Sequence, residues 1–179
     1  STPEDARRSM LYLREADNYS PLEGMRELPD VMNTGQIITH EEIFQVRTDE
    51  EDERHIGELV RILKQRGNLD PILVKALGRN RTVVIDGHHR LLAYETARIN
   101  PVPVEWFHGS IVDALKMAFS SNNKIYLNLT GRQRSNAAWR LVCMTEAEFS
   151  KREISELTGV AISTVANMRS VLRKLEGPK

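Results

Sequence analysis

The sequence predicts an α+β fold in which a small domain with a mixed sheet is followed by an all-helical domain. Three observations lead to this prediction. The apolar runs ILVKAL (72–77) and TVVI (82–85) flank the turn GRNR, a pattern that is typical of a β-hairpin. Strand and helix patterns alternate between about residues 36 and 125. From Thr130 onward, the spacing of apolar residues indicates only helices joined by short turns.

The individual elements have recognisable starts and ends. Residues 53–67 form the clearest helix, because apolar residues recur there at the spacing of one helical face. A helix is expected over PEDARRSMLYLREA, and GQIITHEEIFQVR is expected to hold a strand that leads to a turn. The later elements are expected to be a helix over 88–99, a strand over 102–107 and a helix over 110–121. The expected divisions are an acidic segment over 1–35, the mixed-sheet domain over 36–125 and the helical domain over 126–179.

The composition indicates a packed cytoplasmic protein. Of the 179 residues, 40% are hydrophobic and 28% are charged, and no apolar stretch approaches the roughly 18 residues that span a bilayer. The single cysteine, Cys143, fits a reducing compartment and is expected to be a buried packing residue on a helix. Residues 1–53 carry 14 acidic and 5 basic side chains, whereas residues 54–179 carry 11 acidic and 20 basic ones. This asymmetry favours a polyanionic partner for the basic part, the alternative being a chance imbalance on an ordinary surface.

The stretch VIDGHHRLLA (84–93) places polar residues where a strand is expected to become a helix. A helix N-terminus attracts anions, and Gly87 lets the backbone turn and lets a ligand approach. Arg90 offers donors suited to phosphate, and His88 and His89 add donors near neutral pH. Asp86 could cap the helix, accept hydrogen bonds from a ribose hydroxyl or orient a histidine. The motif therefore indicates a phosphate or nucleotide site, and the alternative is a structural helix start in which the histidines pack.

The same stretch does not predict a metal site. Adjacent residues on a helix point about 100° apart, so His88 and His89 cannot easily bind one ion. No cysteine or third histidine lies at ligand spacing from them. The dense carboxylates of residues 49–53 are interpreted as a solvated helix start.

The stretch FSKREISELTGVAISTVANMRSVLRKL (149–175) is the second motif with a functional meaning. Ser150 and Glu153 have the spacing of a capping box, Gly159 ends this first helix, and a second helix follows. Two helices joined by such a tight turn are the pattern of DNA-binding modules. The alternative is a helical hairpin used only for packing, and Ala161 stands where a Ser or Thr cap is expected.

The outward face of the second helix carries side chains that suit base edges, and both helices carry cations that suit phosphates. Double-stranded DNA is the expected partner, and a homodimer is expected because such proteins bind paired half-sites. The candidate DNA-binding residues are Lys151, Arg152, Ser163, Thr164, Asn167, Arg169, Ser170 and Arg173.

With both motifs placed, residues from about Gln36 to Leu175 resemble the ParB/sulfiredoxin superfamily joined to a helix-turn-helix. QVR (45–47) is similar to the family's Q-P-R box, and VIDGHHRLLAY is similar to its D-G-x-H-R-x-x-A box. NNKIYLNLTGRQR (122–134) falls where the family has E-N-x-x-R-x-x-L, with Tyr126 at the arginine position. The subset with the most similar pattern is the streptomycin-regulator-like transcriptional activators, whose W-S-D-R-x-I-A segment resembles FSKREIS.

The resemblance implies a nucleotide pocket, with CTP or another nucleoside triphosphate and Mg²⁺ as its ligand. Tyr126 and the missing acidic residue before Asn123 argue against efficient hydrolysis, so weak CTPase or NTPase activity stays open. Sulfiredoxin activity is not expected, because the essential cysteine of that reaction would stand at His88. The residues that the resemblance places around the nucleotide are Gln45, Arg47, Asp86, Gly87, His88, His89, Arg90, Asn123 and Lys124.

The sequence thus predicts a DNA-binding ParB-like protein, either a transcriptional regulator or a partition-like factor, that is associated with the nucleoid. One alternative is a nucleotide-dependent enzyme, namely an NTPase, a nuclease or a small-molecule kinase, that uses the DGHHR motif. Another is an interaction protein that keeps the fold without the chemistry. Residues 1–35 could mask the basic tail, mediate contacts or simply pack.

Overall fold

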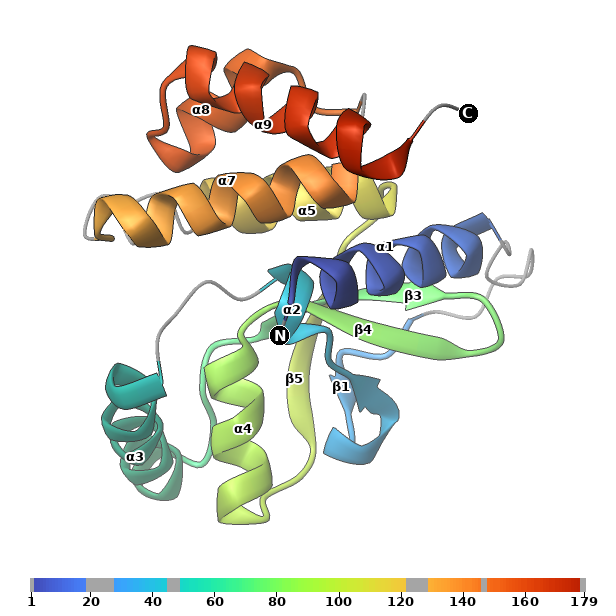
Figure 1. Ribbon diagram of the computed structural model, residues 1–179. Helices are drawn as coiled ribbons and strands as arrows, with labels where there is room; N and C mark the ends of the chain where they lie inside the picture. Colours follow the sequence, from blue (N-terminus) through green and yellow to red (C-terminus); the bar gives the residue numbers. More distant parts are fainter. Residues whose placement is uncertain (1, 19–27, 45–48, 122–128, 146–147, 178–179) are drawn as a thin grey trace.

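The computed structural model describes the backbone of residues 2–18, 28–44, 49–121, 129–145 and 148–177. It contains a five-stranded mixed sheet with helices on both faces and a group of helices at the C-terminal end (Figure 1). The predicted α+β fold class is therefore confirmed. Within the described ranges, no helix is both long and apolar enough to cross a membrane.

The sheet has the strand order β1-β5-β3-β4-β2. The predicted hairpin is confirmed as the antiparallel pair β3 and β4, whose turn places Arg79 and Asn80 in the left-handed region. β5 lies parallel to β3, β2 lies parallel to β4, and β1 pairs antiparallel with β5. The strands are β1 (Val31–Met32), β2 (Ile37–Ile38), β3 (Ile72–Leu77), β4 (Arg81–Asp86) and β5 (Val102–Trp106).

In the segment before the acidic run, the predicted strand is confirmed as β2, but a short helix follows it instead of a turn. A single turn of 3₁₀ helix, η1 (Thr34–Gln36), precedes β2, which has only two residues. The chain then forms the short helix α2 (Glu41–Phe44). The physical reason is that Ile43 and Phe44 are both buried in the core, and adjacent residues of a strand would point to opposite faces.

Alternation along β4 divides the core between the two faces of the sheet. Val84 belongs to the cluster under α3 (Asp49–Arg66) and α4 (His88–Ala97), whereas Val83 and Ile85 belong to the cluster on the other face. That other face is covered by α1 (Pro3–Asn18) and α5 (Ile111–Ser121). The predicted Ser110 start of α5 is confirmed, because its Oγ accepts the N–H of Asp113 at 3.1 Å.

The C-terminal helices are α7 (Gly131–Thr145), α8 (Lys151–Thr158) and α9 (Ile162–Glu176). The predicted capping box is confirmed, because Ser150 Oγ accepts the N–H of Glu153 and the Glu153 carboxylate accepts that of Ser150. Gly159 ends α8 with a φ of 72°, which favours glycine. Cys143 is buried on α7, as expected.

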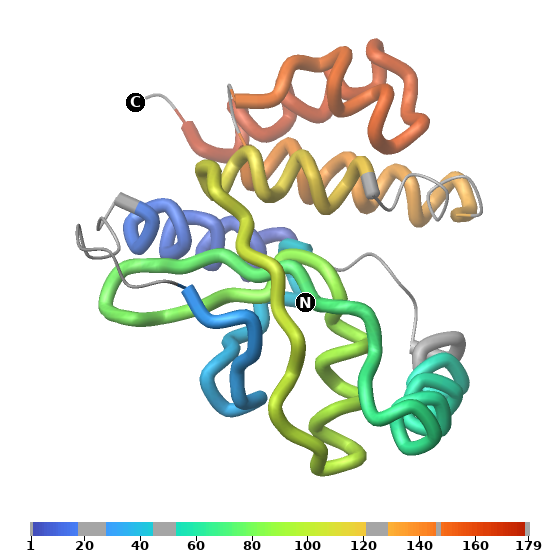
Figure 2. The backbone as a smooth tube through the Cα atoms, turned by 180° about the vertical axis from the view of Figure 1, so that it is seen from behind, coloured from blue at the N-terminus to red at the C-terminus, as the bar shows by residue number. Residues whose placement is uncertain are grey.

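Helix α1 lies between the β3–β4 hairpin and α7 in both views of the backbone (Figures 1 and 2). Ala6, Met10, Leu13 and Ala16 are buried on one stripe, spaced at three to four residues. This stripe joins the core on the sheet face that α1 and α5 cover to the core of the C-terminal helices. Of the roles considered for the first 35 residues, packing is therefore established for residues 3–18.

Candidate functional site

The first candidate site is the turn from β4 into α4. Gly87 stands at the helix start with a φ of 102°, a conformation that L side chains rarely adopt. A Cβ atom there would also lie 2.7 Å from Cγ2 of Ile72 on β3. The close packing of α4 against β3 thus requires glycine at this position, whether or not a ligand binds.

His88, the first residue of α4, is buried with 9% of its surface exposed. Its Nε2 atom is buried and has no hydrogen-bond partner among the described residues. Burial lowers the pKa of His88 to about 4, and the nearby Asp86 charge opposes this shift only in part. His88 is therefore neutral at pH 7 and offers one donor and one acceptor instead of a positive charge.

Arg90 is engaged with the chain itself. Its Nη1 atom donates to the carbonyl of Pro71 at 2.5 Å and to that of Asp70 at 3.2 Å, and its Nη2 atom lies 3.5 Å from Asp86 Oδ2. Gly87 occupies the N-cap position of α4, one residue after Asp86. The guanidinium would have to exchange these partners to bind a phosphate.

The structure brings only part of the expected nucleotide pocket together. Residues 86–90 form one turn at the start of α4, and the ring of His89 meets that of His55 on α3 at 5.4 Å between centroids. The other expected pocket residues lie outside the described residues, namely Gln45, Arg47, Asn123 and Lys124. In the described ranges, no group of three or more His, Cys, Asp or Glu side chains is placed to hold a metal ion.

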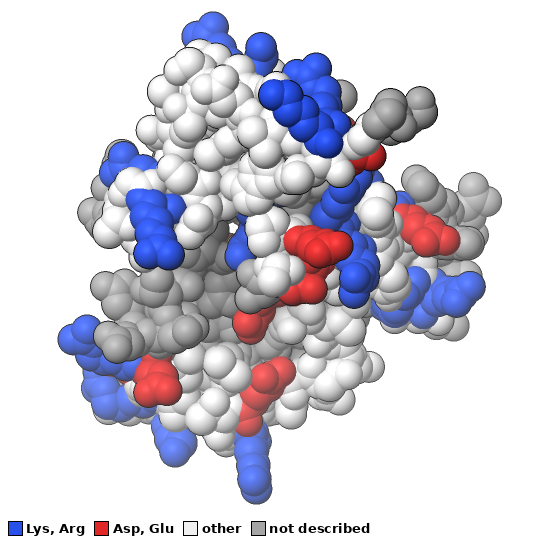
Figure 3. Space-filling model, in the orientation of Figure 1, with Lys and Arg blue, Asp and Glu red and all other residues white. Residues whose placement is uncertain are grey.

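The second candidate site is the outer face of α9. Ser163, Thr164 and Asn167 are exposed, whereas Val165 is fully buried beneath them. Lys151, Arg152 and Arg173 are exposed as well, although Arg152 pairs with Glu156 at 2.9 Å. On the face drawn in Figure 3, Lys and Arg side chains lie over α8 and α9 and also lower on the molecule, whereas most Asp and Glu side chains lie at the level of α1 and below.

Arg169 and Ser170 are less accessible than the other candidate DNA-binding residues. Both are half-buried, and Nη2 of Arg169 donates to the backbone carbonyl of Phe149, just before α8. A signal for this placement was present in the sequence, because Arg169 follows the buried Val165 by four residues and so lies on its side of the helix. Sequence reasoning also missed Arg14, Lys116 and Glu148, which contact the same entry into α8.

Comparison with known proteins identifies the family. Residues 30–123, more than half of the chain, match the ParB N-terminal domain family. The chain belongs to this family. The motif-based resemblance is thereby confirmed, and the DGHHR turn lies within the ParB N-terminal domain, whereas α1 and α7 to α9 lie outside the matched residues.

Two curated relatives are named as a regulator and as a possible regulatory protein. The transcriptional regulator NovG of Streptomyces niveus is 34% identical over 113 residues, which are 63% of this chain and 35% of NovG. A possible regulatory protein of the streptomycin biosynthesis operon of Streptomyces griseus is 35% identical over 124 residues, which are 69% of this chain and 33% of that protein. The chain thus spans about a third of the length of these relatives.

Two similar solved structures are of the C-terminally truncated chromosome-partitioning protein ParB from Caulobacter crescentus. The complex with CTP-gamma-S gives a TM-score of 0.46 at 19% identity and covers 79% of this chain and 77% of that one. The complex with the centromeric parS site gives a TM-score of 0.47 at 19% identity and covers 79% and 71%.

Proposed function

We propose that this ParB-family chain is a DNA-binding transcriptional regulator whose helices α8 and α9 bind duplex DNA. The observation that carries the proposal is the pair of opposite faces on α9, with Val165 buried and Asn167 exposed together with Ser163 and Thr164. The capped helix α8 and the tight turn at Gly159 support the interpretation of the pair as a helix-turn-helix. The two relatives named as regulators support this function over partitioning.

The exposed residues divide by their chemistry into two roles. Asn167 has an amide that can pair with an adenine edge in the major groove, with Ser163 and Thr164 beside it. Lys151 and Arg173 are exposed cations that suit phosphate oxygens and contribute no sequence preference. Two copies bound to paired half-sites in the cytoplasm complete the proposal, since a single recognition helix covers only a few base pairs.

The test is selection of bound sequences from a random duplex library with the full chain, followed by affinity measurements on the enriched duplex. Asn167→Ala should lower affinity for that duplex by about 1–3 kcal/mol and relax preference at one base pair. Gln65→Ala is the matched control, because it removes an exposed amide from α3. Absence of any enriched sequence, or an Asn167→Ala variant with unchanged affinity, would contradict the proposal.

A second proposal is that the first turn of α4 binds the phosphates of a nucleotide, with CTP the first candidate and Mg²⁺ as its counter-ion. It is supported by the buried Nε2 atom of His88, because a buried polar atom without a partner is costly unless something bonds to it. The helix N-terminus and the guanidinium of Arg90 lie in the same turn and suit an anion.

Calorimetry with CTP, ATP and GTP, with and without Mg²⁺, tests this second proposal. Selective binding that is lost in Arg90→Ala supports it, and Arg98→Ala is a control, because Arg98 is an exposed cation at the other end of α4. Phosphate release that vanishes in Arg90→Ala would favour the enzyme alternative. No binding to any of the three nucleotides would leave DGHHR as a structural helix start.

A further inference from the structure

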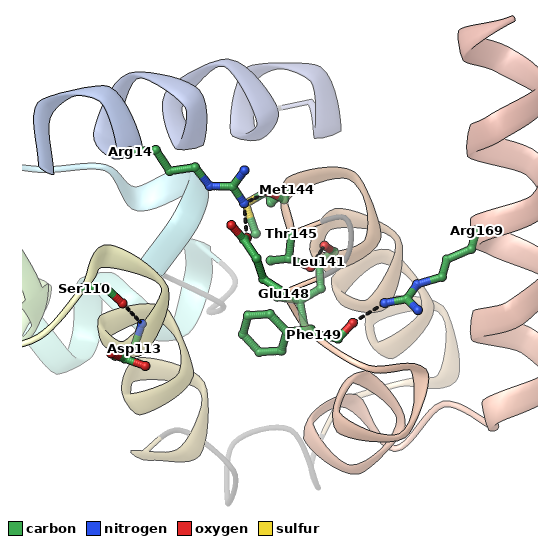
Figure 4. A network of polar contacts seen from close by, with 9 residues as sticks. All are labelled: Arg14, Ser110, Asp113, Leu141, Met144, Thr145, Glu148, Phe149 and Arg169. Atoms are coloured by element: carbon green, nitrogen blue, oxygen red, sulfur yellow. Dashed lines mark hydrogen bonds and ion pairs between the residues drawn. The ribbon is translucent and has the colours of Figure 1, made fainter. Parts of the chain in front are cut away.

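The segment that enters α8, residues 148–153, is contacted by cationic side chains from three other helices. They come from Arg14 on α1, Lys116 on α5 and Arg169 on α9, and Figure 4 shows the first and last of them. We call residues 148–153 and these three side chains the junction. Phe149 lies within it and is fully buried. The start of α8 is thus held from several sides at once.

Arg14 makes the contact between α1 and the junction. Its Nη2 atom donates to the carbonyl of Met144 at 2.9 Å and also bonds to the carboxylate of Glu148. The Met144 carbonyl lies in the last turn of α7, where a cation is favourable because of the helix dipole. One guanidinium therefore holds the end of α7 and the beginning of the segment that leads into α8.

Lys116 supports the same segment from α5. Its ammonium lies 5.1 Å from the centroid of the Phe149 ring and 3.3 Å from Oε1 of Glu153. The other carboxylate oxygen of Glu153 accepts the Ser150 N–H at 2.7 Å and so closes the capping box of α8. The cap and the contact with α5 share one carboxylate.

Helix α1 is fixed at its C-terminal end to the sheet. Asp17 Oδ1 lies 2.7 Å from Nζ of the buried Lys75 on β3, and Asp17 Oδ2 accepts the N–H of Ile111 at the start of α5. Near its other end, Arg7 forms an ion pair with Glu176 on α9. One helix, lying outside the residues that match the family, thus connects the ParB N-terminal domain to both α8 and α9.

We propose that α1 is a brace that sets the orientation of α8 and α9 relative to the ParB N-terminal domain, and that Arg14 is its positioning residue. The inference rests on the proposed DNA-binding function for its effect on affinity, and on the contacts alone for its effect on orientation. When the contacts of Arg14 are removed, α8 and α9 become ordered relative to the ParB N-terminal domain only on binding DNA. The entropy cost of this ordering lowers the affinity for DNA.

The decisive variants are Arg14→Ala and Arg14→Lys in the full chain. Arg8→Ala is the matched control, because Arg8 is an exposed arginine on the same helix. Arg14→Ala should weaken binding to the selected duplex on the order of tenfold without changing the preferred sequence, and Arg14→Lys should restore part of it. Glu148→Gln in combination with Arg14→Ala should add little, because both changes remove the same contact.

Orientation is measured separately, without DNA. Spin labels on cysteines introduced at Gln65 on α3 and Val171 on α9, in a Cys143→Ala background, report the distance between the two parts; both positions are exposed. The labelled protein with Arg14 intact and the labelled Arg8→Ala variant should each give one narrow distance distribution. The labelled Arg14→Ala variant should give a broad one. Should Arg14→Ala fail to fold, Glu148→Gln provides the same comparison with a smaller change.

The two readouts separate the inference from the proposed function. A narrow distribution in both Arg14→Ala and Glu148→Gln overturns the brace, whatever the DNA measurements give. A broad distribution supports the brace even if no variant binds DNA, and in that case only the proposed function fails.

Discussion

Helices α4 and α9 both begin without a side-chain cap, yet their first turns differ in almost every other respect. Gly87 precedes α4 in a left-handed conformation, and the turn that follows holds a buried histidine and an arginine bonded to nearby carbonyls. Ala161 precedes α9 in an extended conformation, and Ile162, Ser163 and Thr164 that follow are exposed. In contrast, α8 begins with a complete capping box.

The difference shows how the two kinds of proposed ligand constrain a helix start. DNA is a large, stiff polyanion, and a protruding turn such as that of α9 can meet it with little rearrangement. A small phosphate ligand at α4 would instead need Arg90 to leave the carbonyls of Asp70 and Pro71. We therefore expect α9 to be preorganised for its ligand and the turn at α4 to change its hydrogen bonds on binding.

Gly87→Ala should produce the largest effect on stability, because it replaces the left-handed glycine that distinguishes the start of α4 from that of α9. The added Cβ would lie 2.7 Å from Cγ2 of Ile72, and the alanine would have to keep the unfavourable positive φ of Gly87. We therefore expect the free energy of unfolding to fall by about 3 kcal/mol or more. Urea denaturation measures this loss. Gly57→Ala on α3 is the control, because nothing lies within 4 Å of its Cβ and alanine favours a helix by about 1 kcal/mol. Equal stability of the two variants would show that the turn can relax.

His88 should make the stability of the α4 turn depend on pH. The unfolded chain takes up a proton on this histidine near pH 6.5, whereas the folded chain does so only near pH 4. Between these values the unfolded state binds more protons, so stability falls as the pH is lowered through this window, by up to about 3 kcal/mol. At pH 7 and above, His88 is neutral in both states, and the contribution of the neutral histidine to stability is fully present.

Denaturation of the protein and of His88→Leu, compared at pH 7 and near pH 4, measures this contribution. The protein should lose more stability than the variant over this window, since leucine fills the buried site and does not titrate. His108→Leu serves as control, because His108 is an exposed histidine in the loop after β5 and lies outside the turn. Parallel losses in the protein and in His88→Leu would mean that the buried histidine accepts a proton without penalty.

Local patterns were sufficient for most of the fold, but they did not predict β1 or show that β2, which lies within the expected strand, would have only two residues. The β3–β4 hairpin and α3 extend over enough residues for their periodicity to be visible, and the structure contains both. β1 and β2 have two residues each, which is too short for an alternating pattern to arise. The extent of each strand is set by its pairing, of β1 with β5 and of β2 with β4, and a sequence does not display such neighbours.

The candidate sites were predictable as positions but not as contacts. The sequence places Asp86 to Arg90 in one turn, yet the carbonyls that Arg90 bonds come from a loop 19 and 20 residues earlier. The contact between Arg14 and Met144 spans 130 residues of sequence, so no local pattern reveals it. Burial of His88 depends in the same way on how α4 packs against the sheet, which a motif does not encode.

Ala161→Ser should have the smallest effect and tests the α9 start directly. The residue before α9 has a φ of −58° and a ψ of 141°, so a serine hydroxyl there can accept an N–H of the first turn. We expect the free energy of unfolding to rise by about 0.5–1 kcal/mol, and Ser150→Ala to lower it by about 1 kcal/mol through loss of the α8 cap. If DNA phosphates use the same N–H groups, Ala161→Ser should gain stability without gaining affinity for the selected duplex. A variant that gains both would show that the uncapped start serves no purpose in binding.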